Sequence, residues 1–299
     1  MTSPLGPNAP TLRQLELFLS LAASDGIASG GSKIGMTPST TSHVLRALET
    51  TLGTDLIDRN APQLELTHAG QQILPHVRDL FAAMHLIQAT AGASAGLDSG
   101  MLRLGSFGLS SSLQLLPPLL QRFRQLYPGI DVRVFEKADA EIEQDLIERR
   151  LEIGVVTLPK GNFDTLQLAE DELVAVLPEG HALAAAASID IRDLGRYPLI
   201  LTHAGSQSLV AKMFARSDTA PKISHELTQM LSILAFVQKG EGISVVASMA
   251  LPDAYPGVVY RPLLPKTARR VGLACLNENR LSPAAAAFWK QAKTSRKKK

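Results

Sequence analysis

The chain has 299 residues, of which 45% are hydrophobic and 19% charged, and its formal net charge is +2. This composition is typical of a folded globular protein with room for two or more domains, and it excludes a disordered chain. The single cysteine, Cys275, excludes an intrachain disulfide and a cysteine-based metal cluster. Because Cys275 lies in the apolar run VGLACL, we expect a buried and unreactive thiol.

The first ten residues lack the basic start and the apolar run of a secretory signal peptide. No apolar stretch reaches the roughly 18 to 20 residues that span a bilayer. We therefore expect a cytoplasmic protein that makes no contact with a membrane.

Residues 11–34 predict two helices. Thr11 and Gln14 have the spacing of a capping box, so a first helix begins after Thr11 and ends near Asp25 and Gly26. A second helix spans about residues 29–34 and contains Gly30 and Gly31. Glycine costs on the order of 1 kcal/mol in a helix interior. We therefore expect another backbone to pack closely against these two glycines.

A third helix is predicted from Thr37 as N-cap, with Pro38 at the first helical position and Gly53 as the C-terminal stop. Its inward face repeats at helical spacing, and its outward face is polar. A short helix with hydroxyls, a histidine and an arginine on its free face can enter a DNA major groove. The inward residues are Thr41, Val44, Leu45, Leu48 and Leu52; the outward ones are Ser39, Thr40, Ser42, His43 and Arg46. Residues 54–66 would form a wing that touches the phosphate backbone.

The outward residues each have a second interpretation. Ser39 and Thr40 either contact DNA or serve only in the first turn, and His43 either contacts DNA or is solvated. Arg46 either pairs with Glu49 or Thr50 or, as we favour, binds a phosphate. Up to Leu66 the chain carries four Lys or Arg and six Asp or Glu, a formal charge of −2. Phosphate neutralisation supplies most non-specific affinity, so one such domain should bind DNA weakly and act in dimers or tetramers.

Residues 68–91 predict a long amphipathic helix, with Pro75 near its start. Its apolar face either packs against the same helix in a second copy, which we favour, or covers its own DNA-binding domain. Residues 91–100 are small and glycine-rich and predict a hinge.

From Met101 onward, apolar strands alternate with helical segments, which predicts an α/β domain with a parallel sheet. Predicted strands lie at residues 101–105, 130–136, 151–158, 173–180, 198–202 and 242–248. The chain ends in a basic run from Lys290 to Lys299, which either contacts DNA or, as we favour, is disordered.

The run LRQLELFLSLAASDG…TPSTTSHVLRALETTLGTDLIDR…LELTHAG resembles the N-terminal domain of LysR-type transcriptional regulators. The chain departs from that family at Gly30 and Gly31, where alanines are usual, at Pro38, where glutamine is usual, and at Ile57. The resemblance implies a winged helix-turn-helix domain over 1–66, a dimerising linker helix and hinge over 67–100, and homodimers or homotetramers that bind double-stranded promoter DNA. By position it implies DNA contacts from Thr37, Ser39, Thr40, Ser42, His43, Arg46 and Arg59.

The remainder, through LRLG…LLPPLL…YPG, EIGVV and GEGIS, resembles the family's two-lobed effector domain, similar to periplasmic binding proteins. By that likeness lobe I is 101–160 with 264–295 and lobe II is 161–263, within a domain spanning 101–299. Ligands of such domains bind where strands end at their carboxyl edges. The effector-binding candidates are therefore Ser106, Phe107, Ser110, Thr157, Thr202, His203, Ser206 and Gln229.

Some of these candidates have other interpretations. Ser110 and Ser206 either bind ligand or only cap helices, and the first helix after residue 105 offers amides that favour an anion. His203 is a ligand donor, a pH-sensitive group or an exposed loop residue. Lys160 is the one cation beside these loops, so we expect a small, weakly charged or monoanionic effector.

No Walker loop, HExxH, GxSxG or dinucleotide fingerprint is present, so we expect no catalytic residues, no metal site, no cofactor and no enzyme activity. We expect a promoter-binding regulator in which an effector changes the geometry of the bound DNA. Two alternatives stay open: a regulator that responds to a protein partner or needs no effector, and a cytoplasmic small-molecule-binding protein with no strong DNA affinity.

Overall fold

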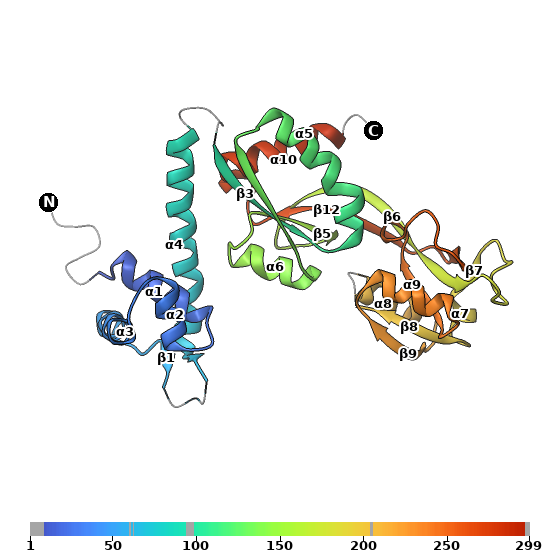
Figure 1. The fold of residues 1–299 in the computed structure, drawn as a ribbon, viewed down its shortest axis with the longest axis horizontal. Coiled ribbons are helices and arrows are strands. Elements are labelled where there is room, and N and C mark those ends of the chain that lie inside the picture. The colour runs from blue at the N-terminus through green and yellow to red at the C-terminus, as the bar shows by residue number, and fades with distance from the viewer. Residues whose placement is uncertain (1–8, 60, 62, 94–98, 204–205, 297–299) are drawn as a thin grey trace. The chain divides into compact units, whose positions relative to one another are not determined.

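The computed structural model describes residues 9–59, 61, 63–93, 99–203 and 206–296 (Figure 1). The chain divides into two compact units, residues 1–87 and 88–299, and each is described by itself. In the described parts of both, no helix is long and apolar enough to cross a membrane.

The N-terminal unit is a three-helix domain followed by a two-stranded wing and a long helix. The predicted capping box at Thr11 and the left-handed C-cap at Gly53, with φ +69°, are both present. α1 ends three residues earlier than expected, where the Ser24 hydroxyl bonds to the Ser20 carbonyl and the chain turns. The elements are α1 (Leu12–Ala22), α2 (Ile27–Lys33), α3 (Pro38–Leu52), β1 (Ile57–Asp58), β2 (Glu65–Leu66) and α4 (His68–Ala93). Pro75 lies within α4, and residues 94–98 of the expected hinge lie outside the described residues.

The two glycines of α2 allow unusually close packing in this unit. A Cβ built at Gly30 would lie 2.6 Å from Leu21 Cδ2 and 3.1 Å from Leu21 Cα of α1. A Cβ at Gly31 would lie 1.9 Å from Thr41 Oγ1 of α3. The expectation that a backbone packs close is thus confirmed at Gly30, whereas at Gly31 the neighbour is a buried side chain.

The C-terminal unit is a mixed α/β domain around a ten-stranded sheet, with strand order β4-β3-β5-β12-β6-β10-β8-β9 and with β11 and β7 alongside. Its strands are β3 (Gly100–Ser106), β4 (Ile130–Glu136), β5 (Ile153–Leu158), β6 (Asp164–Pro178), β7 (Ile189–Asp190), β8 (Pro198–Thr202), β9 (Lys222–Leu227), β10 (Ile243–Ala247), β11 (Val258–Leu264) and β12 (Ala268–Cys275). Its α-helices are α5 (Leu116–Leu126), α6 (Asp139–Ile147), α7 (Ile191–Leu194), α8 (Gln207–Arg216), α9 (Met230–Gln238) and α10 (Pro283–Arg296).

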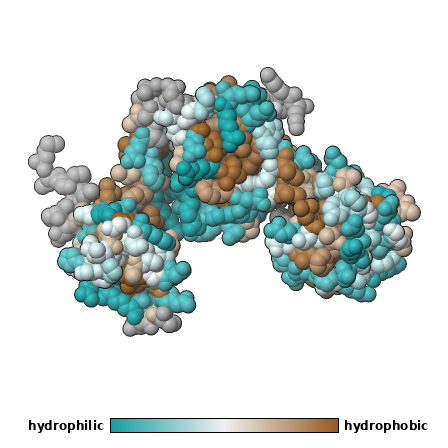
Figure 2. Space-filling view, in the orientation of Figure 1, coloured by the Kyte–Doolittle hydropathy of each residue, from teal (hydrophilic) through white to brown (hydrophobic). Residues whose placement is uncertain are grey.

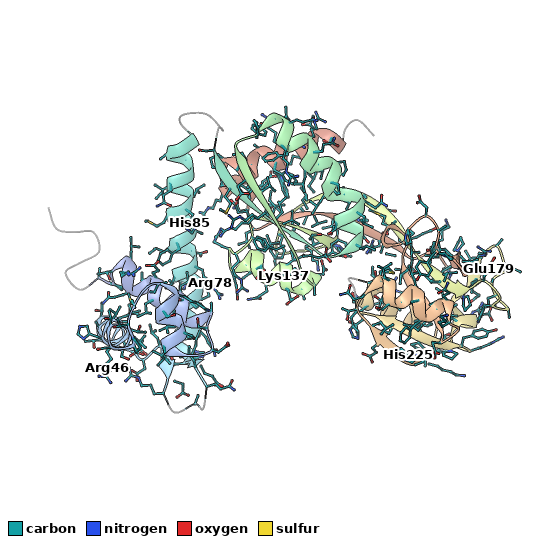
Figure 3. The ribbon with its side chains drawn as sticks, in the orientation of Figure 1. Arg46, Arg78, His85, Lys137, Glu179 and His225 are labelled. Atoms are coloured by element: carbon teal, nitrogen blue, oxygen red, sulfur yellow. The ribbon has the colours of Figure 1, made fainter. Side chains whose placement is uncertain are left out.

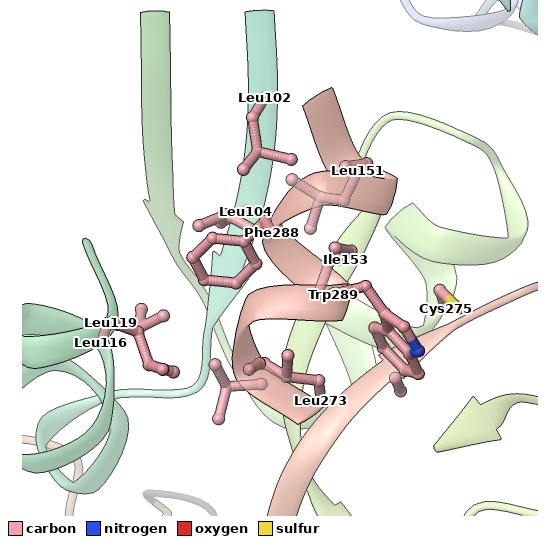
Figure 4. Packing of buried hydrophobic residues seen from close by; sticks show 14 of the residues in the cluster. Leu102, Leu104, Leu116, Leu119, Leu151, Ile153, Leu273, Cys275, Phe288 and Trp289 are labelled. Atoms are coloured by element: carbon pink, nitrogen blue, oxygen red, sulfur yellow. The ribbon is translucent and has the colours of Figure 1, made fainter. Parts of the chain in front are cut away.

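One long strand, β6, belongs to both lobes. Its residues 164–172 pair with β12, whereas residues 174–178 pair with β11 and 173–176 with β10. The sheet therefore divides within β6, about a dozen residues later than the lobe boundary expected at residue 161. The lobe I core gathers β3, β5, β12, α5 and α10 around Phe123, Phe288 and Trp289. Figure 4 shows Phe288 and Trp289 within this core. Cys275 is buried in this core.

The helix expected after β3 begins with a π-helix, η1 (Ser110–Leu115), and continues as α5. Pro117 and Pro118 have no amide hydrogen, so the regular i to i−4 ladder cannot form there. Short π segments often occur at functional sites.

Candidate DNA-binding surface and effector site

The recognition helix α3 presents a polar face. Ser39, Ser42, His43 and Arg46 are exposed, while Thr41 is fully buried and its hydroxyl donates to the Thr37 carbonyl. Figure 3 marks Arg46 on this helix. The inward and outward assignments of the sequence therefore describe the helix correctly.

Two threonines at the start of α3 are partly occupied by capping. The Thr37 hydroxyl accepts from the Thr40 amide at 3.3 Å and lies 2.9 Å from the Thr40 hydroxyl. Both residues remain exposed, so the cap leaves them accessible to a partner. Their helical role is present, and a DNA contact stays a prediction.

Arg46 does not pair with Glu49. Glu49 is 5% exposed, and its carboxylate accepts from the Leu56 and Ile57 amides at 3.0 and 3.4 Å and from Arg59 Nη2 at 2.5 Å. The Thr50 hydroxyl donates to the Arg46 carbonyl, so this contact involves the backbone of Arg46 and not its guanidinium. Within the described part of the chain, no carboxylate lies within ion-pair distance of Arg46.

The wing residue Arg59 is held against the recognition helix by Glu49. About half of the Arg59 side chain is exposed, so it can reach a further partner while it keeps this ion pair. The sequence analysis did not find that Glu49 positions Arg59. The one indication in the sequence is that Glu49, on the recognition helix, stands ten residues before Arg59, on the wing. Arg46 and Arg59 line a cavity of about 400 Å³ together with Glu49, Thr50, Gly53, Thr54 and Asp55.

In lobe I, a chain of hydroxyl groups starts at Ser106, where β3 ends. Ser106 Oγ lies 2.6 Å from Ser111 Oγ and 2.7 Å from Ser112 Oγ, and Ser112 Oγ donates to Glu136 at 2.8 Å. Ser111 Oγ donates to the Gly108 carbonyl at 2.9 Å. Ser112 and Glu136 were missed by sequence analysis, because the parallel pairing of β3 and β4 that brings Glu136 to Ser106 is a tertiary feature.

Ser110 binds a buried ion pair and does not cap a helix. Arg269 Nη2 donates to Ser110 Oγ at 2.9 Å, and the Arg269 guanidinium lies 5.5 Å from the Phe107 ring centroid. Asp171 accepts two bonds from Arg269, at 2.7 and 2.8 Å, and one from the Met249 amide. Side chains of the pair are 1% and 4% exposed. This pair joins the loop after β3 to strands β6 and β12, and sequence analysis did not find it.

Thr157 lies at the end of β5 beside a buried charged cluster. Its amide donates to Asp139 Oδ1 at 3.2 Å, and its hydroxyl oxygen is buried without a partner among the described residues. Lys160 pairs with Asp139 at 3.0 Å and with Glu143. Burial raises the pKa of Asp139 despite Lys160. Burial alone would lower the pKa of Lys160, but the hydrogen bonds that its ammonium donates to Glu143 and Asp139 raise that pKa.

The lobe II candidates follow β8 and β9. Thr202 is buried, and His203 Nε2 lies 2.7 Å from Glu226 Oε2. Ser206 occupies the N-cap position of α8 but makes no side-chain capping bond, and Gln229 holds the same position on α9, also without one. The capping alternative is therefore wrong for the hydroxyls of Ser110 and Ser206. In the described residues no group of three or more His, Cys, Asp or Glu is arranged to hold a metal ion.

Comparison with known proteins assigns both units. The family model "Bacterial regulatory helix-turn-helix protein, lysR family" matches residues 12–71, and the "LysR substrate binding domain" matches residues 95–297. The chain belongs to the LysR family. It is a LysR-type DNA-binding transcriptional regulator with an effector-binding domain, and regulators of this family bind promoter DNA and small-molecule effectors and form oligomers.

One curated relative and two solved structures match this LysR regulator over most of their own chains. An uncharacterized HTH-type transcriptional regulator, YvbU of Bacillus subtilis, is 28% identical over 95% of this chain and 98% of its own. A full-length OxyR variant from Pseudomonas aeruginosa has a TM-score of 0.71 at 22% identity, covering 95% and 94% of the two chains. The effector-binding domain of QuiR in complex with shikimate has a TM-score of 0.61 at 27% identity, covering 67% of this chain and 98% of that one.

Proposed function

We propose that the exposed face of α3 reads the half-sites of a pseudo-palindromic promoter, with Arg46 and Arg59 binding phosphates beside it. The supporting observation is that Arg46 has no internal carboxylate partner in the described part of the chain, while Glu49 holds Arg59 against the same helix. Ser39, Ser42 and His43 would face the base edges, with Thr37 and Thr40 beside them at the helix start.

We infer a homodimer through α4 and a homotetramer through the effector domains. Leu80 and Ile87 of α4 are 37% and 65% exposed, as expected of a helix that packs against a second copy. Lobe I also shows apolar surface in the space-filling view (Figure 2). Because residues 1–66 carry a formal charge of −2, several linked half-sites would supply the affinity that one domain lacks.

We infer that a small-molecule effector binds where β3 and β8 end and shifts the arrangement of the lobes. The candidate contacts are those of the loops after these strands, and the QuiR complex supports a small-molecule ligand for a domain of this kind. The ligand can change the geometry of the bound DNA only by as much as its affinity differs between the two arrangements. We propose that the protein has no enzyme activity, needs no cofactor and works in the cytoplasm.

The decisive experiment is fluorescence anisotropy of the full-length protein on its own upstream DNA at several salt concentrations. Ser42→Ala and Arg46→Ala test the α3 face, and Ser32→Ala on the exposed side of α2 is the matched control. We expect sequence-preferring binding that both α3 variants weaken, with a salt slope lowered by about 0.9 in Arg46→Ala. Equal affinity for specific and unrelated DNA at low salt would refute the proposal.

A further inference from the structure

The positive charge of the chain is concentrated in residues 290–299. This run contains six Lys or Arg and no Asp or Glu, a formal charge of +6, whereas the whole chain carries +2. The other 289 residues therefore have a formal net charge of −4, and residues 1–66, which contain the recognition helix, carry −2. Linked half-sites multiply the affinity of this acidic domain for DNA, but they add no cation to neutralise phosphates.

The first part of this basic run is helical, whereas the sequence analysis favoured disorder for all of it. α10 continues to Arg296, and Lys290 and Lys293 therefore lie on a regular helix. Phe288 and Trp289 bury the inner side of this helix in the lobe I core, while both lysines are exposed. Cations held on a packed helix lose less conformational entropy on binding than cations on a disordered segment would.

A cation of α5 lies beside this run. α5 and α10 pack side by side (Figure 1), and Gln291 Nε2 donates to the Leu119 carbonyl of α5 at 2.9 Å. One turn later along α10, Ser295 Oγ lies 3.5 Å from Arg122 Nη1. Neither helix contains an Asp or a Glu. We call the exposed cations of these two packed helices the α10 basic surface: Arg122, Lys290 and Lys293.

Most of this charge is not neutralised within the described part of the chain. No carboxylate described by the structure lies within ion-pair distance of Arg122 or Lys290. Lys293 pairs with Glu278 at 2.6 Å, yet 48% of its side chain is exposed. The Arg122 guanidinium and the Lys290 ammonium are therefore available to an anionic partner.

We propose that the α10 basic surface binds the phosphate backbone of duplex promoter DNA and supplies phosphate neutralisation that the N-terminal domain lacks. Residues 290–296 of α10 rise about 9 Å along the helix axis, and a DNA strand presents one phosphate per about 3.4 Å of its axis. The surface therefore matches two or three consecutive phosphates. Phosphate contacts carry no sequence information, so the surface adds affinity but not specificity. This inference rests on the promoter binding proposed above and adds a second DNA contact to it.

The side chains around these cations favour DNA over a lipid membrane. Helices that lie on membranes bury large apolar side chains between the headgroups. Among the described residues, the exposed positions of α10 are Ala286, Lys290, Lys293 and Thr294, none of which is a large apolar residue. A continuous strand of phosphates matches a surface of this kind.

The test is fluorescence anisotropy of the full-length protein on its upstream DNA and on an unrelated duplex of equal length, at several salt concentrations. The test variant, Arg122→Gln with Lys290→Gln, removes two charges from the α10 basic surface. The matched control, Lys212→Gln with Lys239→Gln, removes two exposed charges from lobe II. Each lost phosphate contact lowers the salt slope by about 0.9, which is about an eightfold loss of affinity at about 0.1 M salt.

We expect the test variant to lose affinity for both duplexes by the same factor, about eightfold or more, and the control to stay within about twofold of wild type. Arg122→Lys with Lys290→Arg keeps both charges and should bind both duplexes like wild type, which separates the role of charge from that of packing. A test variant that binds both duplexes as tightly as the control overturns the inference. So does a test variant that loses affinity for phosphatidylserine vesicles and keeps its affinity for DNA.

Ser42→Ala distinguishes this failure from that of the proposed function. It removes a side chain of the recognition helix and should weaken binding to the promoter more than binding to the unrelated duplex. If Ser42→Ala does so while the test variant binds like wild type, only the second DNA contact is wrong. Wild type that binds neither duplex at low salt refutes both proposals.

Discussion

The contact between Gly31 and Thr41 sets how closely α2 approaches the recognition helix, and it predicts an unusual cost for Gly31→Ala. Alanine normally stabilises a helix interior by about 1 kcal/mol relative to glycine. Here the new Cβ would lie 1.9 Å from Thr41 Oγ1 and 2.9 Å from its Cβ and Cγ2. Thr41 cannot turn away freely, since it is buried and its hydroxyl donates to the Thr37 carbonyl at 2.8 Å.

Overpacking costs about 1–3 kcal/mol, and an approach of 1.9 Å to a buried side chain places this clash at about 2–3 kcal/mol, so a net destabilisation of about 1–2 kcal/mol remains after the helix gain. Hydrogen exchange of the amides in residues 27–52 of the full chain should then quicken by about 5- to 30-fold. Ser32→Ala, exposed in the same helix, adds helix propensity without a clash and should not quicken exchange.

A double-mutant cycle identifies the cause. Thr41→Ala alone loses a buried hydrogen bond and a methyl group and should cost about 1–2 kcal/mol. If the clash explains the cost of Gly31→Ala, the double variant will be more stable than the two single effects added together, by roughly 1 kcal/mol or more. Strict additivity, or a Gly31→Ala protein as stable as wild type, would refute the reasoning.

Three further predictions concern charge and burial. Asp55→Asn removes a carboxylate from the cavity lined by Arg46 and should tighten DNA binding by about two- to fivefold in anisotropy, whereas Asp25→Asn, exposed and outside that cavity, should change it less. Arg269→Met leaves the buried Asp171 carboxylate without its ion-pair partner and should lower the unfolding free energy of lobe I by about 3–5 kcal/mol. Denaturant unfolding followed by the fluorescence of Trp289, the only tryptophan in the sequence, measures this loss. A loss under about 1 kcal/mol would contradict the prediction. Burial raises the pKa of the Cys275 thiol to about 12, so the fold favours its neutral form. Stability should therefore fall as the pH rises above the ordinary thiol pKa of 9.0, and native protein at pH 8 should resist alkylation until denaturant is added.

Local patterns predicted most of the N-terminal unit, because caps and helical spacing act within a few residues. The limits of α3 follow from Thr37, Pro38 and Gly53, and all three positions behave as expected. The end of α1 was placed too late, since the chain turns after Ala22, where the Ser24 amide donates to the Leu21 carbonyl and the Ser24 hydroxyl to the Ser20 carbonyl. The role of Arg59 was incomplete for a different reason: its partner Glu49 lies across a turn, and burial of that carboxylate depends on how the wing folds back.

In the C-terminal unit the strands were found, but their partners were not. The strand β6 was expected to begin near residue 173. Its first half, which contains Asp171, was therefore assigned to lobe II, whereas in the structure it pairs with β12 of lobe I. The Arg269–Asp171 pair joins residues 98 positions apart, which no local pattern can bring together. Glu136 reached the site in the same way, through the pairing of β3 with β4. Residues such as Ser106, at the end of a strand, were found because strand ends are visible in sequence.

The charges of the DNA-binding domain and of the effector-binding domain both bear on how the protein is regulated. On the proposed assembly, each recognition helix brings one unpaired arginine to DNA from a domain whose formal charge is −2, so a single half-site is bound weakly. Occupancy then depends on how many linked half-sites are engaged at once, which is a matter of spacing. A ligand that changes the spacing of the half-sites changes the free energy of binding at several linked sites. The same free-energy change therefore alters DNA occupancy more here than it would at one strong site. The buried Arg269–Asp171 pair ties the loop carrying Ser110 to β12 and to the first half of β6, next to the lobe division. On this proposal, a ligand that orders this loop would act on these strands through a contact too costly to break, and it would change the geometry of the bound DNA without abolishing the DNA-binding surface.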